Sequence, residues 1–308
     1  MSSISIVIVS FNAREHLERC LAAVAGGAHE VVVVDNASAD GSPALVRGRF
    51  PSVRLVELEE NRGFGAANNA GMEAASCDLF LLLNSDAWPV GDAIERLAAF
   101  ADARPRAGIV GPRLRNPDGS LQPSVRGWPT TWRLATEYLF LRRLGRRTRA
   151  LNAFYGAGFD HETVREVEVV KGAVMLVRRE AAEVVGGFDP DYFMYGEEMD
   201  LCYRIRQAGW VVVFDPEAEF VHVGGVSTGA RWGERPTFGP MRREQLRGHI
   251  RFVAKHEGAQ SAERARRLLV ASCRLRALLF RGDVGKAYRE AGDWLASGSV
   301  PELLASRG

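Results

Sequence analysis

The chain has 308 residues, 46% of them hydrophobic, so it can bury a sizeable core as one large domain or as one domain with a smaller appendage. This composition excludes a chain that is disordered throughout. The formal net charge is only +2, but residues 240–281 carry eleven Lys or Arg against three Asp or Glu, whereas residues 1–239 sum to −5 (26 basic, 31 acidic). Such a basic segment either meets an anionic partner, such as nucleic acid, lipid or an acidic substrate, or is a solvated helical face.

The four cysteines are far apart in the sequence, at Cys20, Cys77, Cys202 and Cys273. They lack the close pairs of a zinc ribbon or of a secreted disulfide scaffold, which favours a reducing cytosol. No basic leader precedes residue 4, and no apolar run approaches the roughly 18 residues that cross a bilayer. We therefore expect a cytoplasmic protein that is neither exported nor membrane-spanning.

Apolar strand-like runs alternate with helical stretches over the first 83 residues. The expected strands are residues 4–9, 30–35, 53–58 and 79–83. A helix containing Leu17, Leu21 and Val24 is expected after Asn12 as its N-cap, and further helices at 43–50 and 65–75. Because this alternation is typical of a parallel, doubly wound sheet, the sequence predicts an α/β fold.

The regular alternation stops near residue 112. A turn at Asn116-Pro-Asp-Gly119 predicts a hairpin or excursion within residues 113–127. Residues 132–149 combine aromatic and leucine residues with six arginines, as expected of an interfacial helix or of a core-packed helix whose arginines face water. A strand at 174–177, a helix at 197–208 and short strands at 211–214 and 220–223 follow. Beyond Pro240 the pattern is helical, with a break at Gly282.

Polar residues follow several of the strands, at the edge where open parallel sheets bind ligands. They are Ser10, Asn12, Asp35, Asn36, Asn84, Ser85 and Asp86. The carboxylate of Asp35 could accept hydrogen bonds from a nucleobase or ribose, although an Asp after a strand also stabilises turns. Asp86 could bind Mg²⁺ or Mn²⁺ together with diphosphate oxygens, and the alternative is an Asx turn.

Two further segments could contribute to the chemistry. Glu197-Glu-Met-Asp200 begins a helix, where the dipole favours acidic residues, and a carboxylate whose pKa is raised by burial could act as a general base. His222 ends a strand before glycines, as a metal ligand or as a hydrogen-bonded structural residue. Gly63-Phe-Gly65 lacks the Lys-Ser/Thr of a Walker motif and the spacing of a dinucleotide fingerprint, which disfavours ATP hydrolysis and hydride transfer.

Five blocks, in order, resemble the family 2 glycosyltransferases, which have the GT-A fold, and especially bacterial rhamnosyltransferase-like members. They are Val7-Ile-Val-Ser-Phe-Asn12, Val34-Asp-Asn-Ala-Ser38, Asn61-Arg-Gly-Phe-Gly-Ala-Ala-Asn-Asn69, Leu83-Asn-Ser-Asp86 and Gly187-Phe-Asp followed by Phe193-Met-Tyr-Gly-Glu-Glu-Met-Asp-Leu201. The resemblance extends from residue 4 to about 227. It implies a GT-A nucleotide-binding domain with a mostly parallel sheet at 1–239, a nucleotide-sugar half at about 1–112, an acceptor half at about 113–239 and a basic helical extension at 240–308.

The resemblance also implies a role for individual residues. The nucleotide-binding residues would be Ser10, Asn12, Asp35, Asn61, Asn68, Asn84 and Ser85. Residues 84–86 correspond to the family's Asp-x-Asp motif with its first Asp replaced, so Asp86 is the retained metal ligand, and His222 resembles the late histidine that completes a Mg²⁺ or Mn²⁺ site. Glu198 stands where the family usually has an Asp base, with Glu197 as the second candidate, and Glu197 and Asp200 would contact or support the acceptor.

The implied reaction is an inverting single displacement, in which Glu198 deprotonates an acceptor hydroxyl that attacks the anomeric carbon of a nucleotide-diphosphate sugar. The subgroup suggests dTDP-rhamnose as donor and a glycan or a polyprenyl-diphosphate-linked sugar as acceptor, in cell-surface polysaccharide synthesis. A double displacement would need a carboxylate nucleophile on the opposite face of the sugar, and the sequence offers no clear candidate.

The segregated charge predicts peripheral, salt-sensitive binding to the cytoplasmic face of an anionic membrane through residues 132–149 and 240–281. No nucleic acid partner is expected. One alternative is a nucleotide-sugar-binding module that has lost its catalytic base. The other is a nucleotidyltransferase, which would need a Gly-rich basic loop after the first strand, and residues 10–13 do not provide one.

Overall fold

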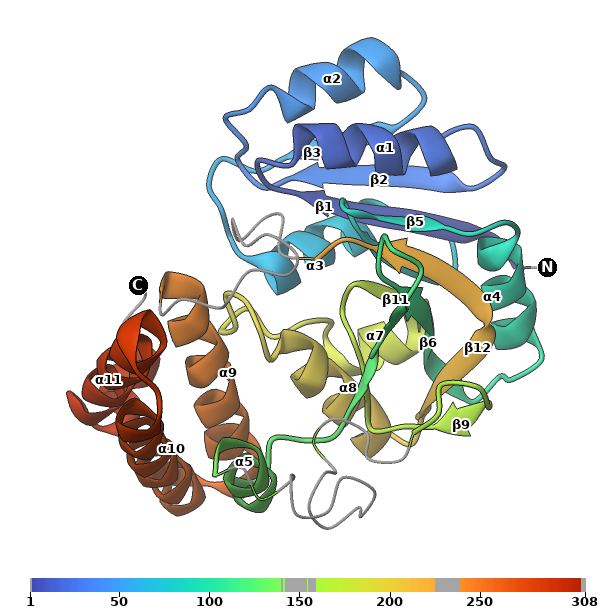
Figure 1. Cartoon of the computed structure of the whole chain (residues 1–308). Helices are drawn as coiled ribbons and strands as arrows, with labels where there is room; N and C mark the ends of the chain where they lie inside the picture. Colours follow the sequence, from blue (N-terminus) through green and yellow to red (C-terminus); the bar gives the residue numbers. More distant parts are fainter. Residues whose placement is uncertain (1, 140, 142–153, 155–158, 225–238, 306–308) are drawn as a thin grey trace. The chain divides into compact units, whose positions relative to one another are not determined.

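The computed structural model describes residues 2–139, 141, 154, 159–224 and 239–305, which form two compact units (Figure 1). Unit 1 comprises Met1–Val125, Asp160–Phe193 and Glu197–Glu234, and unit 2 comprises Arg126–Phe159, Met194–Gly196 and Arg235–Gly308. Part of the expected acceptor half thus packs with the C-terminal helices. The functional boundaries at about 112 and 239 stay predictions, because compactness alone does not define a substrate-binding half.

A large twisted sheet forms the centre of unit 1, with the strand order β3-β2-β1-β4-β11-β6-β12-β5. The strands of this path are β1 (Ile4–Ser10), β2 (Glu30–Asp35), β3 (Arg54–Glu57), β4 (Leu79–Asn84), β5 (Ala87–Pro89), β6 (Ala107–Arg115), β11 (Val174–Arg178) and β12 (Val211–His222). Strands β3, β2, β1 and β4 are parallel, β6 and β12 are parallel to each other, and β11 is antiparallel to both β4 and β6. This mostly parallel sheet confirms the predicted α/β class.

Short strands complete the sheet at its margins. β7 (Leu121–Gln122) pairs with β6 as the predicted hairpin around Asn116-Pro-Asp-Gly119, and β9 (Arg165–Glu166) pairs with β12. Two more short strands are β8 (Val125–Arg126) and β10 (Val169–Val170). The hairpin therefore returns the chain along β6, on the edge of β6 opposite to β12.

Helices cover both faces of the sheet in unit 1. They are α1 (Arg14–Val24), α2 (Ser42–Arg49), α3 (Phe64–Ala74), α4 (Ala93–Asp102), α7 (Arg179–Val185) and α8 (Glu197–Gln207). Alternate residues of β1 point to opposite faces. Ile6 and Ile8 join a core with α1, α2 and α4, whereas Val7 faces α3, which lies on the other side of the sheet from α1 and α2 (Figure 1). A Cβ on Gly71 of α3 would overlap Val7, so glycine permits this close packing.

Unit 2 is helical. It contains α5 (Thr131–Tyr138), α9 (Pro240–Glu257), α10 (Ala259–Leu279), α11 (Gly282–Ala296) and α12 (Val300–Ala305). The buried Arg276 joins α10 to α5, because its Nε donates to the carbonyl of Tyr138 at 2.8 Å and its Nη2 to that of Glu137 at 2.9 Å. Burial, then the charges of Arg242 and Arg126, lowers the pKa of His249 to about 3, so this core imidazole is neutral. Across the described ranges, no helix combines the length and apolarity needed to cross a bilayer.

Two local predictions are wrong. Asn12 does not cap α1, whose N-cap is Ala13; it adopts a left-handed φ of 48°, and its Oδ1 accepts a hydrogen bond from the amide of Ala39 at 2.8 Å. The two short strands at 211–214 and 220–223 are one strand, β12, because a register shift between Asp215 and Glu219 absorbs the interruption. Residues 140 and 142–149 of the expected interfacial helix lie outside the described residues.

Candidate functional site

The ends of β1, β2 and β4 bring predicted nucleotide-binding residues side by side in unit 1. Ser10 is in register with Asp35, and Val9 with Asn84. Ser10 Oγ, Asp35 Oδ1 and Asn84 Oδ1 are buried and have no hydrogen-bond partner within the described structure. A buried polar atom without a partner costs about 1–3 kcal/mol, and such atoms are uncommon in native proteins. Three of them at neighbouring strand ends indicate a place where a ligand supplies the missing hydrogen bonds.

The loop after β2 holds the carboxylate of Asp35 in place. Its Oδ2 accepts a hydrogen bond from the amide of Ser38 at 2.8 Å, which is the turn geometry considered as the alternative role. Ser38 Oγ in turn accepts from the amide of Asn12 at 3.0 Å. One oxygen of Asp35 therefore stabilises the loop while the other has no hydrogen-bond partner among the described residues, and Asn12 joins the loops after β1 and β2.

A second loop, after β3, is fixed by Asn36. Its Nδ2 donates to Asn61 Oδ1 at 2.8 Å, and its Oδ1 accepts from the amide of Arg62 at 2.9 Å. Gly63 has a φ of 84°, and a Cβ there would overlap the carbonyl of Phe193. The next amide donates to that same carbonyl at 3.0 Å. The loop is thus pinned to the segment that precedes α8, and Asn61 acts in the structure as one of its hydrogen-bonding supports.

The two adjacent asparagines of α3 have different partners. Asn68 is buried and its Nδ2 donates to the carbonyl of Phe64, one turn earlier, at 2.9 Å. Asn69 makes two hydrogen bonds of 2.8 Å with the backbone of Phe188, one from its amide and one to its oxygen. Asn69 therefore holds the segment that leads toward α8. The nucleotide-binding role of Asn68 stays a prediction, as does that of the buried Ser85.

Asp86 and His222 lie together, as the sequence predicts for a metal site. Asp86 Oδ2 accepts from the amide of Gly224 at 2.8 Å, and its Oδ1 lies 3.4 Å from His222 Nε2. Asn84 Nδ2 is 3.3 Å from the same ring nitrogen. Burial acts to raise the pKa of Asp86, but the hydrogen bond and charge that a protonated His222 supplies, and the amide of Gly224, together hold it below its ordinary value.

The chemistry of this pair fits a divalent cation. Imidazole nitrogen and carboxylate oxygen are ordinary ligands of Mn²⁺, and carboxylate oxygen of Mg²⁺. Among the described side chains, no group of three or more His, Cys, Asp or Glu could hold a metal ion. A cation at Asp86 and His222 would therefore depend on further oxygens from a bound ligand such as a diphosphate.

Two of the three carboxyl groups in the first turn of α8, those of Glu197 and Asp200, lie in different environments. Burial, and next the charge of Glu198, raises the pKa of Glu197 well above its ordinary value, and Glu197 Oε2 is buried without a hydrogen-bond partner among the described residues. Asp200 is fully buried and accepts from Arg204 Nε at 2.6 Å. Arg204 also donates to the carbonyl of Gly187 at 2.8 Å. Asp200 is therefore engaged in an internal ion pair that anchors α8.

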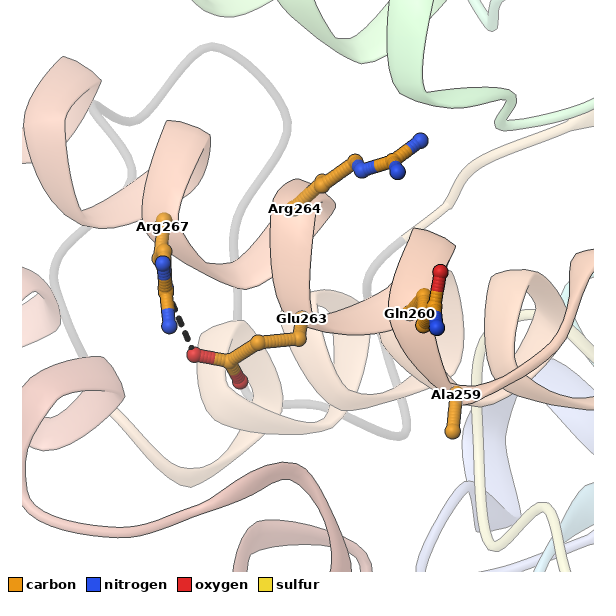
Figure 2. A pocket seen from close by; sticks show the side chains of 5 residues that line it. All are labelled: Ala259, Gln260, Glu263, Arg264 and Arg267. Atoms are coloured by element: carbon orange, nitrogen blue, oxygen red, sulfur yellow. Dashed lines mark hydrogen bonds and ion pairs between the residues drawn. The ribbon is translucent and has the colours of Figure 1, made fainter.

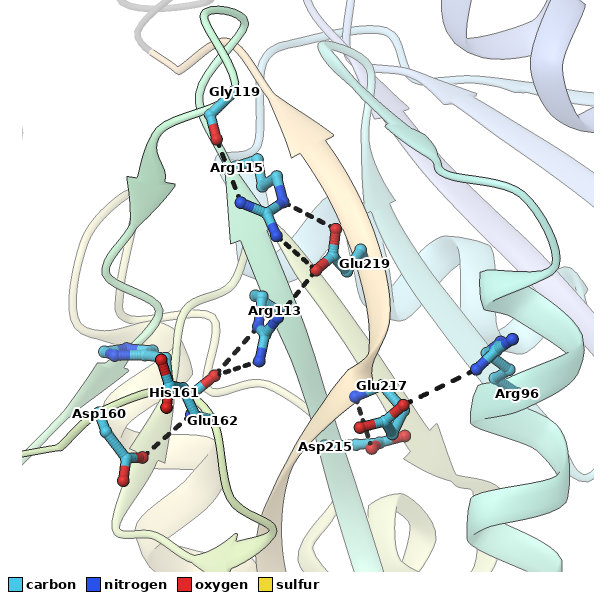
Figure 3. Close-up of polar contacts among 10 residues, drawn as sticks. All are labelled: Arg96, Arg113, Arg115, Gly119, Asp160, His161, Glu162, Asp215, Glu217 and Glu219. Carbon is cyan, nitrogen blue, oxygen red and sulfur yellow. Dashed lines mark hydrogen bonds and ion pairs between the residues drawn. The ribbon is translucent and has the colours of Figure 1, made fainter.

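A cluster of charges fixes the hairpin against β12 (Figure 3). Arg115 donates to both oxygens of Glu219 at 2.7 Å, and Arg113 donates to one of them at 2.9 Å. The hydrogen bonds from Arg115, and to a smaller extent those from Arg113, lower the pKa of Glu219, although its partial burial acts to raise it. Arg115 also donates to the carbonyl of Gly119 in the hairpin turn at 3.2 Å. The end of β12, which carries His222, is thus held beside the hairpin.

Sequence reasoning missed Gln122, which lies in that hairpin and contacts His222. Its Oε1 is 2.7 Å from His222 Nδ1, and its Nε2 donates to the backbone carbonyl of His222 at 3.0 Å. A glutamine in a two-residue strand has no chemical signature of its own. Only the tertiary pairing of β7 with β6 brings it to the end of β12.

A surface depression of about 400 Å³ lies elsewhere, at the start of α10 in unit 2 (Figure 2). It is lined by Ala259, Gln260, Glu263, Arg264 and Arg267. Hydrogen bonds from Arg266 and Arg267 lower the pKa of Glu263 to about 2. None of the residues predicted for the site lines this depression, so it belongs to the basic surface of α10.

Comparisons with known proteins give a consistent result. Residues 5–167 match the sequence profile described as Glycosyl transferase family 2. The chain is 36% identical over 239 residues to the N-acetylglucosaminyl-diphospho-decaprenol L-rhamnosyltransferase of Mycobacterium tuberculosis, covering 73% of this chain and 77% of that protein.

Two solved structures are similar in fold. GalNAc-T7, crystallised with UDP, GalNAc and Mn²⁺, gives a TM-score of 0.60 at 16% identity, covering 96% of this chain and 56% of that one. Mannosyltransferase PcManGT from Pyrobaculum calidifontis, in complex with GDP-Man and Mn²⁺, gives 0.53 at 19% identity, covering 99% and 85%. At these identities the similarity concerns the fold alone.

Proposed function

Since this chain belongs to glycosyltransferase family 2, we propose that it transfers a sugar, with inversion, from a nucleotide-diphosphate donor to a hydroxyl of a lipid-linked glycan. The observation that carries the donor assignment is the set of unpartnered buried atoms of Ser10, Asp35 and Asn84 at adjacent strand ends. A base and a ribose present the donors and acceptors that these atoms lack. Structures with this fold are known with UDP and with GDP-Man, which supports the assignment.

Asp86 and His222 would hold the divalent cation, Mn²⁺ or Mg²⁺, together with diphosphate oxygens. When bound, such a cation offsets the negative charge of the leaving diphosphate. The Nε2 of His222 faces Asp86 Oδ1 at 3.4 Å, and a cation between the two would be attracted by both. The Mn²⁺ in the two solved structures supports this cofactor class.

Glu198 is the proposed base. It stands where members of the family usually have an Asp base, and Glu197 is the second candidate. Glu198 then takes the proton of the acceptor hydroxyl as the oxygen bonds to the anomeric carbon. The bond from that carbon to the donor's diphosphate breaks, and its electron pair leaves with the diphosphate. Asp200 supports this arrangement through Arg204 and not by contact with the acceptor.

The relative that acts on a diphospho-decaprenol substrate supports a lipid-linked acceptor, and its rhamnosyl activity supports dTDP-rhamnose as the donor to test first. An acceptor that is anchored by a lipid lies in a membrane, so the proposal includes binding of the protein to a membrane surface. The α10 outer face is defined by the exposed residues Arg264, Arg267, Arg274, Leu275, Leu278 and Leu279. Near an anionic leaflet each arginine contributes about 1 kcal/mol, and Leu278, 84% exposed, would gain about 1.5–3 kcal/mol on full burial in hydrocarbon. Binding would be peripheral, on the cytoplasmic face, and weakened by salt.

The test is a panel of nucleotide sugars, with dTDP-rhamnose included, assayed for hydrolysis and for transfer to a polyprenyl-diphosphate-linked sugar. Each donor is assayed with Mg²⁺, with Mn²⁺ and with EDTA. We expect one donor to be consumed only in the presence of metal. We expect Glu198→Gln to lower turnover by about 100-fold or more, while the affinity of this variant for the donor stays nearly unchanged. Donor binding without any turnover in the wild type would instead identify a non-catalytic binding module, and the same loss in Glu197→Gln alone would exchange the two roles.

A further inference from the structure

The buried side chain of Gln122 has a fixed orientation. Its Nε2 donates to the backbone carbonyl of His222 at 3.0 Å and to Asn116 Oδ1 at 2.8 Å. Its Oε1 accepts from Lys171 Nζ at 2.6 Å. A backbone carbonyl can only accept and an ammonium can only donate, so these partners determine which end of the amide is nitrogen and which is oxygen.

This orientation determines the protonation of the His222 ring. The amide oxygen of Gln122 lies 2.7 Å from Nδ1 and cannot donate, so Nδ1 carries the proton. Nε2 then points toward Asp86 Oδ1 and Asn84 Nδ2, at 3.4 and 3.3 Å. A neutral imidazole with its proton on Nδ1 keeps the lone pair of Nε2 available on the side of Asp86.

We propose that Gln122 is a positioning residue, which holds His222 in the Nδ1–H tautomer and so presents Nε2 to a divalent cation beside Asp86. This inference rests on the proposed metal-dependent function. In a metal-binding histidine, the N–H of the ring nitrogen that does not bind the metal commonly donates a hydrogen bond to an oxygen. Loss of that acceptor typically lowers metal affinity by about 10-fold to 100-fold. Lys171 keeps the acceptor oxygen in place, and the charge cluster of Arg115 and Glu219 keeps the hairpin beside β12.

Without Gln122 the ring has a competing arrangement. The proton can move to Nε2, and this N–H would donate a hydrogen bond to Asp86 Oδ1. The nitrogen that a cation needs is then occupied. Gln122→Leu has no polar atom for Nδ1 and should favour this second tautomer. Gln122→Glu keeps an oxygen for Nδ1–H and for Lys171 and should therefore preserve the first tautomer, while it loses the two bonds that Nε2 donates to Asn116 and to the carbonyl of His222. Ser124→Ala is the matched control, because Ser124 is buried in the same segment, and its hydroxyl bonds to the carbonyl of Pro112 at 3.2 Å.

The experiment has two readouts. Nitrogen-15 NMR of histidine-labelled protein without metal, at mildly alkaline pH, reports the tautomer of His222, with His222→Gln used to identify its signals. Calorimetric titration with MnCl₂ in the presence of dTDP, or of UDP, reports metal affinity. We expect Gln122→Leu to gain the Nε2–H tautomer and to lose about 10-fold to 100-fold in Mn²⁺ affinity. Gln122→Glu should keep the Nδ1–H tautomer, and Ser124→Ala should stay close to the wild type in both readouts.

An unchanged tautomer and unchanged Mn²⁺ affinity in Gln122→Leu would overturn the proposal, as would an equal loss in Ser124→Ala. If Gln122→Leu does not fold, Gln122→Met, which is unbranched and of similar length, takes its place with the same expectations. If the wild type binds no Mn²⁺ with either nucleotide, the proposed metal dependence fails. The NMR comparison then still decides whether Gln122 sets the tautomer.

Discussion

Two glycines with nearly the same backbone conformation allow the tie between the loop after β3 and the segment before α8 to be measured. Gly63 has φ and ψ of 84° and 172°, and Gly258 has 86° and 168°. Alanine in this region costs about 1–3 kcal/mol. A Cβ on Gly258 meets nothing within 4 Å, whereas on Gly63 it would overlap the carbonyl of Phe193. Gly258→Ala therefore measures the backbone strain alone, and Gly63→Ala measures the strain together with the overlap.

The overlap adds a calculable loss. Moving the backbone at Gly63 breaks the 3.0 Å hydrogen bond from the next amide to Phe193 and the 3.0 Å bond from the Gly63 amide to Asn61 Oδ1, at about 1 kcal/mol each. We expect Gly258→Ala to lower the free energy of opening in unit 2 by about 1–3 kcal/mol, and Gly63→Ala to lower that of unit 1 by about 3–5 kcal/mol.

Amide hydrogen exchange resolves the two units, with β1 reporting on Gly63→Ala and α10 on Gly258→Ala. Calorimetric titration with dTDP should show weaker binding only for Gly63→Ala, because Asn61 and its loop move with the backbone. Equal losses of stability in the two variants, or wild-type dTDP affinity in Gly63→Ala, would refute the reasoning.

Three further predictions concern ionisation, metal and membrane. The pKa of Glu197 is raised in the folded protein, so the wild type loses stability as the pH rises above 4.5, the ordinary pKa of a glutamate. Glu197→Gln should therefore be more stable than the wild type above that pH. Thermal unfolding of both proteins at several pH values checks this, and melting temperatures that change with pH in parallel would contradict it. Asp86→Ala should abolish the metal dependence of dTDP binding, and an affinity that still rises with Mn²⁺ would count against Asp86 as a ligand. Leu278→Glu should reduce co-sedimentation with anionic liposomes at low salt by about 10-fold or more, as loss of more than about 1.4 kcal/mol implies. Val184→Glu, at a 64% exposed position in unit 1, should not, and equal effects would remove the α10 outer face from the interaction.

The first half of the sheet was predictable because its strands are short, apolar and separated by turns or helical stretches. Strands β1 to β4 and helices α1 to α3 match the expected segments within about two residues. The assignment to family 2, made from five sequence blocks, is confirmed. Several of these blocks end a strand or follow it directly, so the parallel register of β1, β2 and β4 brings their residues together.

The second half was harder to predict for physical reasons. β6 was not expected, because Gly108, Gly111 and Pro112 interrupt its apolar pattern, although they fit a strand closely covered by neighbours such as Val170. β12 was predicted as two separate strands, because a register shift arises from the pairing of two strands and cannot be recognised in the sequence of one. What Gln122 contacts depends on residues far apart in the chain, such as His222 and Lys171.

The unpartnered atoms of Ser10, Asp35 and Asn84 would also affect how long the protein survives in a cell, if a ligand completes their hydrogen bonds. Each destabilises the empty fold by about 1–3 kcal/mol, whereas a ligand that binds them stabilises only the folded chain. With a nucleotide sugar as that ligand, the chain would open more often when the sugar is scarce and would be more exposed to proteases. A change of 1–2 kcal/mol can alter the abundance of a protein several-fold. The supply of its own donor would thus set the amount of enzyme as well as its rate, without any dedicated regulatory site.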